Sequence, residues 1–131
     1  SFIQCDIRTK AGLKKLSNKI YGKKFKIIID DGSHILTHII KNIIFFTYFI
    51  EQGGFFVIED FNLPKNYKNL NDADNKEINI DEIFKNIEQK KYFKSDILSK
   101  DKQKYLFETI ENIYVYKGDG KDSDIAFLKI K

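Results

Sequence analysis

Apolar positions at the start of the chain predict a short strand followed by an amphipathic helix. Residues 2–5 begin with two apolar side chains and read as the end of a strand. Between residues 11 and 21, leucine and isoleucine recur at spacings of three and four, which is the pattern of a helix with one apolar face. Gly22 follows at the position where a helix commonly ends in the left-handed conformation.

The pattern then changes to two apolar runs separated by a long apolar stretch. Residues 25–29 and 55–58 are rich in β-branched and aromatic side chains, which is typical of strands buried on both faces of a parallel sheet. Residues 35–50 are apolar nearly all round, which predicts a well-buried helix closed by Gly53 and Gly54. Strand, helix and strand form a βαβ unit, for which a right-handed crossover is expected.

Polar residues dominate the stretch after the second apolar run. Residues 62–79 hold Pro64, the only proline, among many asparagines, aspartates and lysines, and we expect an exposed loop there. Asn79 and Glu82 have the spacing of a capping box at the start of a helix. That helix is predicted to bury Ile80, Ile83, Phe84 and Ile87.

The end of the chain is predicted to be a helix and a β-hairpin. A further helical stretch covers residues 102–110, and strands are expected at 113–116 and 124–130. The glycine-rich turn at 118–123 is too short for a helical crossover, so these two strands should be antiparallel. The predicted fold class is therefore α/β, with parallel strands followed by a C-terminal antiparallel hairpin.

Composition narrows the classes of protein to which the chain can belong. Its 131 residues suffice for one domain, and 42% hydrophobic residues allow a core. The net charge of +4 comes from lysines scattered among Asp and Glu, so nucleic-acid binding is not expected. Cys5 is the only cysteine, which excludes an internal disulfide and fits a reducing cytoplasm. No apolar run reaches the roughly 18 residues of a membrane span, and because the first residue is not Met we expect more chain upstream.

Acidic residues follow both apolar runs where the predicted strands end. Asp30 and Asp31 come directly after the first run, and Glu59 and Asp60 after the second. Ligands of an open α/β sheet gather beyond the carboxyl ends of its strands, so these carboxylates should crowd one edge. A divalent cation would relieve their repulsion, and oxygen ligands favour Mg²⁺ or a similar ion. His34 should face the same edge, where it could take a proton from a metal-bound hydroxyl.

Each of these residues also has a plainer interpretation. The acids can be solvated turn residues or helix caps, and Asp30 in particular a cap or a backbone orienter. Ser33 is a candidate N-cap of the following helix, which would put His34 in its first turn. His38 is expected to be a partly buried structural histidine, although a zinc-binding pair with His34 remains open. Two other functions remain open: a receiver-like α/β domain that binds a metal or phosphate, and a non-enzymatic binding domain.

Two segments together resemble a known enzyme class. Phe-Lys-Ile-Ile-Ile-Asp-Asp-Gly-Ser-His at residues 25–34 and Gly-Gly-Phe-Phe-Val-Ile-Glu-Asp at residues 53–60 are similar to motifs of class I S-adenosylmethionine-dependent methyltransferases. Within that class they resemble the metal-dependent sugar O-methyltransferases of macrolide biosynthesis. The mycinamicin and macrocin O-methyltransferases and the cephalosporin hydroxylase-like proteins belong to this family. The resemblance is best over residues 25–60 and thin over residues 63–110.

The resemblance implies a metal-assisted transfer of a methyl group to a hydroxyl. Asp31, Glu59 and Asp60 match the family's metal ligands, and His34 matches its general base. The implied cofactors are S-adenosylmethionine and Mg²⁺ or a similar divalent cation. The implied partner is a small-molecule substrate, such as a sugar or another metabolite with a free hydroxyl. Neither a nucleic acid nor a membrane is expected as a partner, and a homo-oligomer is compatible with this picture.

The resemblance also implies that the chain is the C-terminal part of a Rossmann-like methyltransferase, a three-layer sandwich. Residues 1–131 would form a single partial domain from the third strand onward, and the cofactor-binding N-terminal half would lie upstream of Ser1. Asp6 matches an acidic position after the third strand, near the adenine, and Asp30 is assigned with it to cofactor binding. The fragment itself is then expected to be inactive and to expose a sheet edge and an apolar face.

Overall fold

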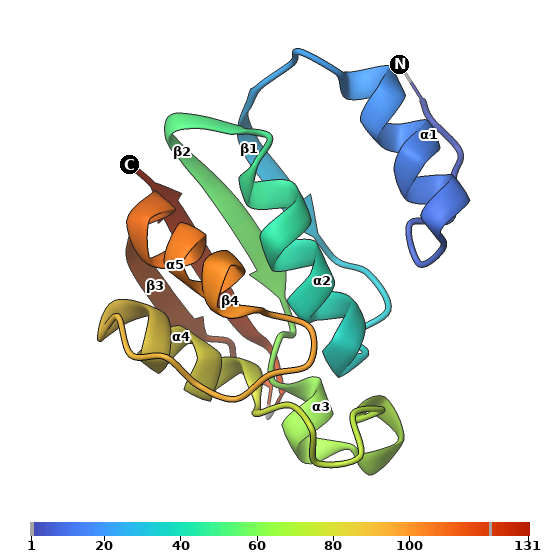
Figure 1. The fold of residues 1–131 in the computed structure, drawn as a ribbon. Coiled ribbons are helices and arrows are strands. Elements are labelled where there is room, and N and C mark those ends of the chain that lie inside the picture. Colours follow the sequence, from blue (N-terminus) through green and yellow to red (C-terminus); the bar gives the residue numbers. More distant parts are fainter. Residues whose placement is uncertain (1, 121) are drawn as a thin grey trace.

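Helices and strands follow one another along the chain largely as the hydrophobic pattern predicts (Figure 1). The computed structural model describes residues 2–120 and 122–131. In chain order, the elements are α1 (Lys10–Ile20), β1 (Phe25–Asp30), α2 (Leu36–Thr47), β2 (Ile50–Glu59), α3 (Leu63–Asn66), the 3-10 turn η1 (Lys68–Leu70), α4 (Ile80–Glu88), α5 (Lys100–Thr109), β3 (Ile110–Lys117) and β4 (Asp124–Ile130). Among the described residues, no helix has the length and apolar character needed to cross a membrane.

The strands form one sheet in the order β1-β2-β4-β3. β1 and β2 are parallel neighbours, with Asp30 opposite Ile58, and α2 connects them. β4 runs antiparallel to both β2 and β3, which confirms the predicted C-terminal hairpin. The chain therefore has the predicted α/β fold class, with a parallel pair of strands followed by an antiparallel pair.

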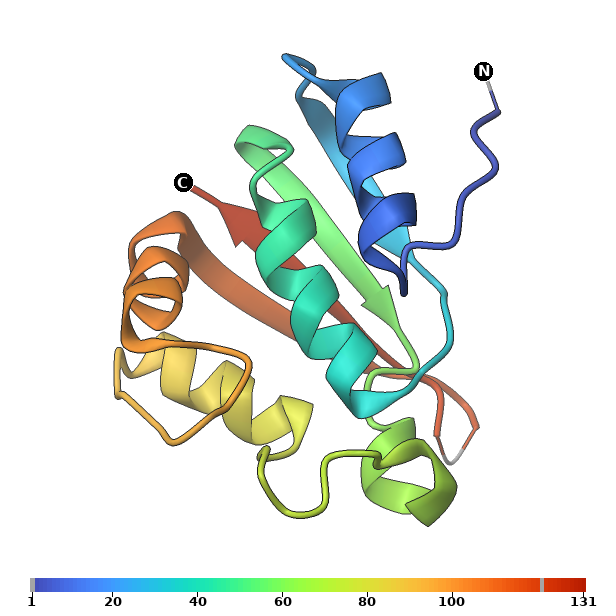
Figure 2. The same ribbon diagram turned by 45° about the vertical axis from the view of Figure 1, so that its right-hand side comes forward.

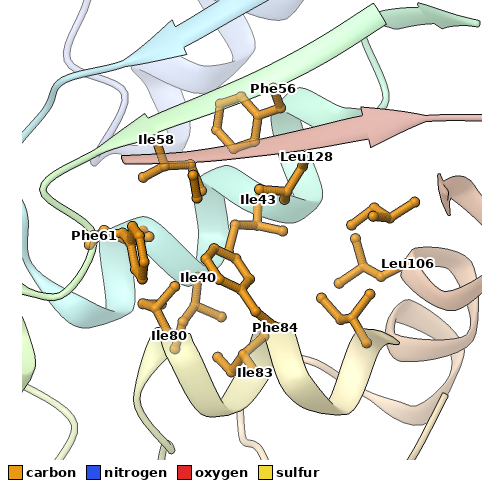
Figure 3. Packing of buried hydrophobic residues seen from close by; sticks show 14 of the residues in the cluster. Ile40, Ile43, Phe56, Ile58, Phe61, Ile80, Ile83, Phe84, Leu106 and Leu128 are labelled. Atoms are coloured by element: carbon orange, nitrogen blue, oxygen red, sulfur yellow. The ribbon is translucent and has the colours of Figure 1, made fainter. Parts of the chain in front are cut away.

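The hydrophobic core lies on one face of the sheet, where α2, α4 and α5 pack (Figures 1 and 2). Figure 3 shows Ile40 and Ile43 of α2 among Phe56 of β2 and Ile83 of α4. All four side chains are 0% exposed. Burying a side chain of this size is worth about 1.5–3 kcal/mol, so this cluster holds the helices against the sheet.

The opposite face of the sheet carries apolar side chains that no element of the described chain covers. Ile27 and Ile29 of β1 are 57% and 61% exposed, and Tyr116 of β3 is 56% exposed. Together with Phe55 and Phe127 they line a shallow hollow of about 860 Å³. The prediction that β1 is buried on both faces is therefore wrong for this structure, because helices pack on one face only.

Two local predictions about strands are corrected. Residues 2–5 are not a strand, and no strand of the described sheet pairs with them. Gly53 and Gly54 do not close α2 but lie inside β2, where the pairing with β1 is irregular. Gly53 has a φ of 77°, and a Cβ at Gly54 would lie 2.6 Å from the carbonyl oxygen of Lys26. The two glycines therefore let an irregular part of β2 pass close to β1.

The predicted exposed loop at residues 62–79 is partly folded and partly buried. It contains α3 and η1, and it buries Pro64 and Ala73. Glu77 is also buried, because its carboxylate accepts hydrogen bonds from the backbone N–H groups of Asp96 and Ile97. The polar composition of this segment thus reflects hydrogen bonds within the protein as well as contact with water.

Helix ends agree with the sequence at α1 and α4. Gly22 follows α1 with a φ of 72°, the left-handed conformation that was predicted. The backbone N–H of Asn79 donates to Glu82 Oε2 at 3.2 Å, as part of the predicted capping box. α4 buries the predicted residues Ile80, Ile83, Phe84 and Ile87.

Candidate metal centre

The carboxyl ends of β1 and β2 bring three predicted site residues together. Because the two strands are parallel neighbours, the residues that follow them leave the sheet at the same edge. One ligand atom from each of Asp31, His34 and Asp60 lies within 4.8 Å of the others. Asp31 is exposed, whereas His34 and Asp60 are half-buried. The predicted meeting of side chains at this edge is therefore observed for these three residues.

His34 and Asp60 both have a left-handed backbone conformation. Their φ angles are 55° and 51°. This region costs an ordinary residue about 1–2 kcal/mol, although Asp and His tolerate it better than most. Such residues persist where the surrounding structure over-determines them, which is common at functional sites. In this conformation His34 Nε2 lies 3.7 Å from Asp31 Oδ1.

Asp30 is not part of this cluster and is buried in the protein. It is 9% exposed, and Asn42 of α2 donates a hydrogen bond of 2.9 Å from Nδ2 to its Oδ2. Its Oδ1 fills the space beside Gly32, where a Cβ would lie only 2.8 Å away. Asp30 therefore connects the loop after β1 to α2 through a hydrogen bond. This agrees with its plainer interpretation as a residue that orients the backbone. Its assignment to cofactor binding stays a prediction.

Glu59 lies outside the cluster formed by Asp31, His34 and Asp60. It is the last residue of β2, and its side chain borders the hollow on the open face of the sheet. It also borders a cavity of about 10 Å³ together with Asp30 and His34. A bound ion would have to draw its carboxylate toward Asp31 and Asp60, so its role as a metal ligand stays a prediction.

Ser33 does not cap α2, which corrects the predicted start of that helix. The N-cap is Ile35, which makes no side-chain capping hydrogen bond. His34 therefore precedes the helix instead of lying in its first turn. Ser33 Oγ shares a hydrogen bond of 2.7 Å with His38 Nδ1. His38 thus has a polar partner within the protein, as expected of a structural histidine.

Asp6 lines a second pocket, which reaches the loop of the candidate metal centre. The pocket has a volume of about 270 Å³ and is also bordered by Arg8, Ser33 and His38. The Asp6 carboxylate accepts hydrogen bonds from the backbone N–H, Nε and Nη2 of Arg8 at 2.8 to 3.0 Å. The bonds from the Arg8 guanidinium, and then the backbone bond, lower the pKa of Asp6 from its usual 3.8 to about 2. Asp6 is therefore an anion at neutral pH.

Three residues that shape the site were not predicted from the sequence. Asn42 had a signal, because it is a polar residue inside an otherwise apolar helix. Arg8 stands two residues from Asp6, a spacing too common to indicate a pair. Asp72 accepts hydrogen bonds from the backbone N–H and Oγ1 of Thr37 at 3.1 and 2.6 Å. Thr37 and Asp72 are 35 positions apart, so no local sequence pattern predicts this contact.

The clustered side chains fit a divalent cation in their chemistry and approximately in their spacing. Two carboxylates and one imidazole nitrogen are donors that such ions accept. With bond lengths of about 2.1 Å, neighbouring ligands of Mg²⁺ lie about 3 Å apart and opposite ones about 4.2 Å apart, so donor atoms separated by up to 4.8 Å must move closer together to share one ion. A ligand set that includes the His34 imidazole favours a transition metal. A ligand set of carboxylate oxygens alone, from Asp31, Asp60 and Glu59, favours Mg²⁺.

Comparisons with known proteins identify the fold as part of a methyltransferase fold. Neither the protein-family models nor the curated proteins include a match. Among solved structures, the MycE methyltransferase from the mycinamycin biosynthetic pathway in complex with Mg and SAH is similar, with a TM-score of 0.66 and 24% identity. MycE in complex with Mg, SAH and mycinamycin VI is also similar, with a TM-score of 0.68 and 23% identity.

The extent of this likeness limits what it establishes. The alignments cover 98% of this chain but only 31% of the MycE chain, so the chain spans about a third of the length of these proteins. At this level of identity the comparison establishes a shared fold. The mixed sheet, with its parallel β1–β2 pair and its antiparallel hairpin, is thus the methyltransferase architecture over the matched part.

Proposed function

We propose that this chain is part of an S-adenosylmethionine-dependent O-methyltransferase, which uses a divalent cation to methylate a hydroxyl of a small molecule such as a sugar. The observation that carries the proposal is the meeting of Asp31, His34 and Asp60 at the ends of two parallel strands. The left-handed conformations of His34 and Asp60 support it. The shared fold supports it further, because MycE is a methyltransferase in complex with Mg and SAH.

In this proposal Asp31, Glu59 and Asp60 hold the cation and His34 is the general base. The cation, when bound, lowers the pKa of the accepting hydroxyl. His34, whose Nε2 lies 3.7 Å from Asp31 Oδ1, would take the proton of that hydroxyl. The half-burial of His34 restricts the approach of water to the transferred proton. Alignment of donor and acceptor supplies much of the remaining acceleration.

The donor side of the proposed site is the pocket beside Asp6. We propose that the adenine end of S-adenosylmethionine lies there, with Asp6 accepting hydrogen bonds from it. Because Arg8 donates to both carboxylate oxygens, the cofactor would bond to the lone pairs that remain free. Asp30 is bonded to Asn42 inside the protein, which supports its alternative role of orienting the loop, and its contact with the cofactor stays a prediction.

We also propose that the 131 residues are the C-terminal part of a larger domain, whose other strands and helices cover the open face of the sheet. Parallel strands with apolar side chains on both faces occur in sheets that are covered on both sides. Here Ile27 and Ile29 of β1 are largely exposed, and the outer edge of β1 has no partner in the described part of the chain. That free edge is where further strands could continue the sheet.

Binding of the dye ANS, which reports exposed apolar surface, tests the larger domain. The chain by itself should bind ANS and self-associate through the open face. A protein extended at the N-terminus should do neither, because the same face would be covered. A monomeric chain that leaves ANS fluorescence unchanged would contradict the proposal.

Methyl transfer from S-adenosylmethionine to a panel of sugar hydroxyls, measured in the extended protein, tests the activity. Turnover should need a divalent cation and fall by about 10²- to 10⁴-fold in His34→Gln, the usual contribution of a general base. Asp74→Asn is the matched control, because Asp74 is exposed and lies outside the site. Turnover that needs no cation and survives His34→Gln would contradict the assigned roles.

A further inference from the structure

The segment that follows β2, residues 61–79, is fastened to the β3–β4 hairpin. Asn66 Nδ2 and Tyr67 Oη donate hydrogen bonds of 2.6 and 2.8 Å to the two carboxylate oxygens of Asp122. Figures 1 and 2 show α3, within this segment, beside the end of β2 and the start of α2. The segment therefore lies next to the edge of the sheet that carries the proposed metal centre.

The same segment supplies the cap of α2. Ile35, the N-cap residue of α2, has no side-chain oxygen to offer, and the first turn of the helix holds no acidic residue. Asp72 Oδ1 accepts a bond of 3.1 Å from the backbone N–H of Thr37, the second residue of the helix. Asp72 Oδ2 accepts one of 2.6 Å from Thr37 Oγ1. An N-cap side chain makes the same backbone bond, and a negative charge is favourable at this end, so Asp72 caps α2 from 35 residues away.

The cap at the start of α2 lies close in the sequence to His34 and constrains its backbone. α2 begins at Leu36, two residues after His34, whose φ of 55° is left-handed. Such a conformation is favoured where the neighbouring structure over-determines it. On the strand side, the bond between Asp30 and Asn42 fixes the loop. On the helix side, the first turn of α2 must be held in place.

We propose that Asp72 is a positioning residue for His34. Through Thr37, its carboxylate fixes the start of α2 and with it the backbone conformation of His34. The inference rests on the proposed function in so far as His34 belongs to the metal centre. It also gives residues 61–79 a defined role. This segment lies beside the proposed metal centre and holds the start of α2, the helix that follows His34.

NMR spectroscopy of the protein extended at the N-terminus tests this role through four variants. In Asp72→Ala, hydrogen exchange of the Thr37 amide should accelerate by about 2- to 30-fold, as expected for the loss of an N-cap. The ¹³Cα and ¹³Cβ shifts of His34, which report its backbone angles, should move away from their left-handed values. Thr37→Ser keeps both donors and should change neither. Asp74→Asn is the matched control on the same segment and should also change neither.

If Asp72→Ala does not fold, Asp72→Asn keeps the size of the side chain and should give smaller changes in the same direction. Faster exchange at Thr37 with unchanged His34 shifts would overturn the proposal, because Asp72 would then be a helix cap alone. Unchanged exchange at Thr37 would overturn it as well.

A titration with Mn²⁺ separates this inference from the proposed function. In the unsubstituted chain, Mn²⁺ should broaden the signals of His34 and Asp60 through its unpaired electrons. Absence of broadening would contradict the metal centre, while the His34 shifts in Asp72→Ala would still decide the role of Asp72. Broadening together with unchanged His34 shifts in Asp72→Ala would leave the metal centre standing and overturn the positioning role.

Discussion

Asn42 and Asp30 form a buried hydrogen bond that joins α2 to the end of β1. The bond is 2.9 Å long, and neither side chain is more than 9% exposed. Burying a polar side chain is unfavourable unless it makes a hydrogen bond. The buried Asp30 carboxylate and the buried Asn42 amide therefore each need the other as a partner. Asp31 and His34 lie in the loop that Asp30 begins. The pair therefore fixes the point from which those two side chains reach the proposed metal centre.

Asn42→Ala is predicted to destabilise the protein by about 1–3 kcal/mol, because it leaves the buried carboxylate of Asp30 without its partner. The free energy of unfolding in urea, followed by circular dichroism, measures the effect. Asn69→Ala is the control, since Asn69 is exposed, and it should change stability by no more than about 0.5 kcal/mol. Equal losses in the two variants would show that the bond to Asp30 is unimportant.

Gly32→Ala is predicted to act through the same hydrogen bond. Its new Cβ would lie 2.8 Å from Asp30 Oδ1 and would displace the carboxylate from Asn42. The double variant Gly32→Ala/Asn42→Ala should therefore lose less stability than the sum of the single losses, by at least about 0.5 kcal/mol. Unfolding in urea of all three variants measures this coupling. Simple additivity would mean that the clash is relieved without disturbing Asp30.

The left-handed backbone of Asp60 predicts that substitutions at this position affect cation binding and stability differently. With a φ of 51°, Asp60→Gly should be more stable than Asp60→Ala by about 1 kcal/mol, because glycine has no Cβ to strain. Both variants lack the carboxylate and should bind a divalent cation poorly. Thermal unfolding measures the difference in stability. If Asp60→Ala proves as stable as Asp60→Gly, the left-handed conformation is not a constraint.

The pair of Asp6 and Arg8 predicts a shift that can be read by titration. Arg8→Gln should return the pKa of Asp6 from about 2 toward 3.8, and carboxyl ¹³C NMR measures it. Because the pKa is lower in the folded protein, the pair stabilises the fold above pH 3.8, and this contribution disappears as the pH falls toward 2. Lys10→Gln is the control and should leave the pKa in place. A pKa that stays near 2 in Arg8→Gln would assign the shift to another group.

The spacing of apolar residues is enough to predict β1, α2 and the second half of β2, but it does not predict that β2 begins at Ile50, inside the expected helix. Every strand or helix that contacts the core must be apolar at a fixed period, so the sequence carries that information locally. The edge where Asp31 and Asp60 meet also follows, because parallel neighbours end at the same side of a sheet. The meeting of these two residues follows from the topology, but Glu59, which was predicted on the same ground, lies outside their cluster.

Features that depend on contacts distant in the sequence could not be predicted. Residues 62–79 are polar in composition, and nothing near them indicates that Asp72 bonds to Thr37. Ser33 was a reasonable N-cap from local chemistry, but the carboxylate of Asp72 takes that role. The apolar side chains of β1 predicted a strand covered on both faces, but in the described chain helices cover only one of them.

Binding of Mn²⁺, followed by the loss of its free electron paramagnetic resonance signal, tests the metal centre most directly. The unsubstituted chain should bind one ion, and Asp31→Asn and Asp60→Asn should each weaken binding by at least about tenfold, since each removes a charged ligand. Asp74→Asn should bind like the unsubstituted chain. A chain that binds no Mn²⁺, or one whose affinity is the same in all three variants, would contradict the account.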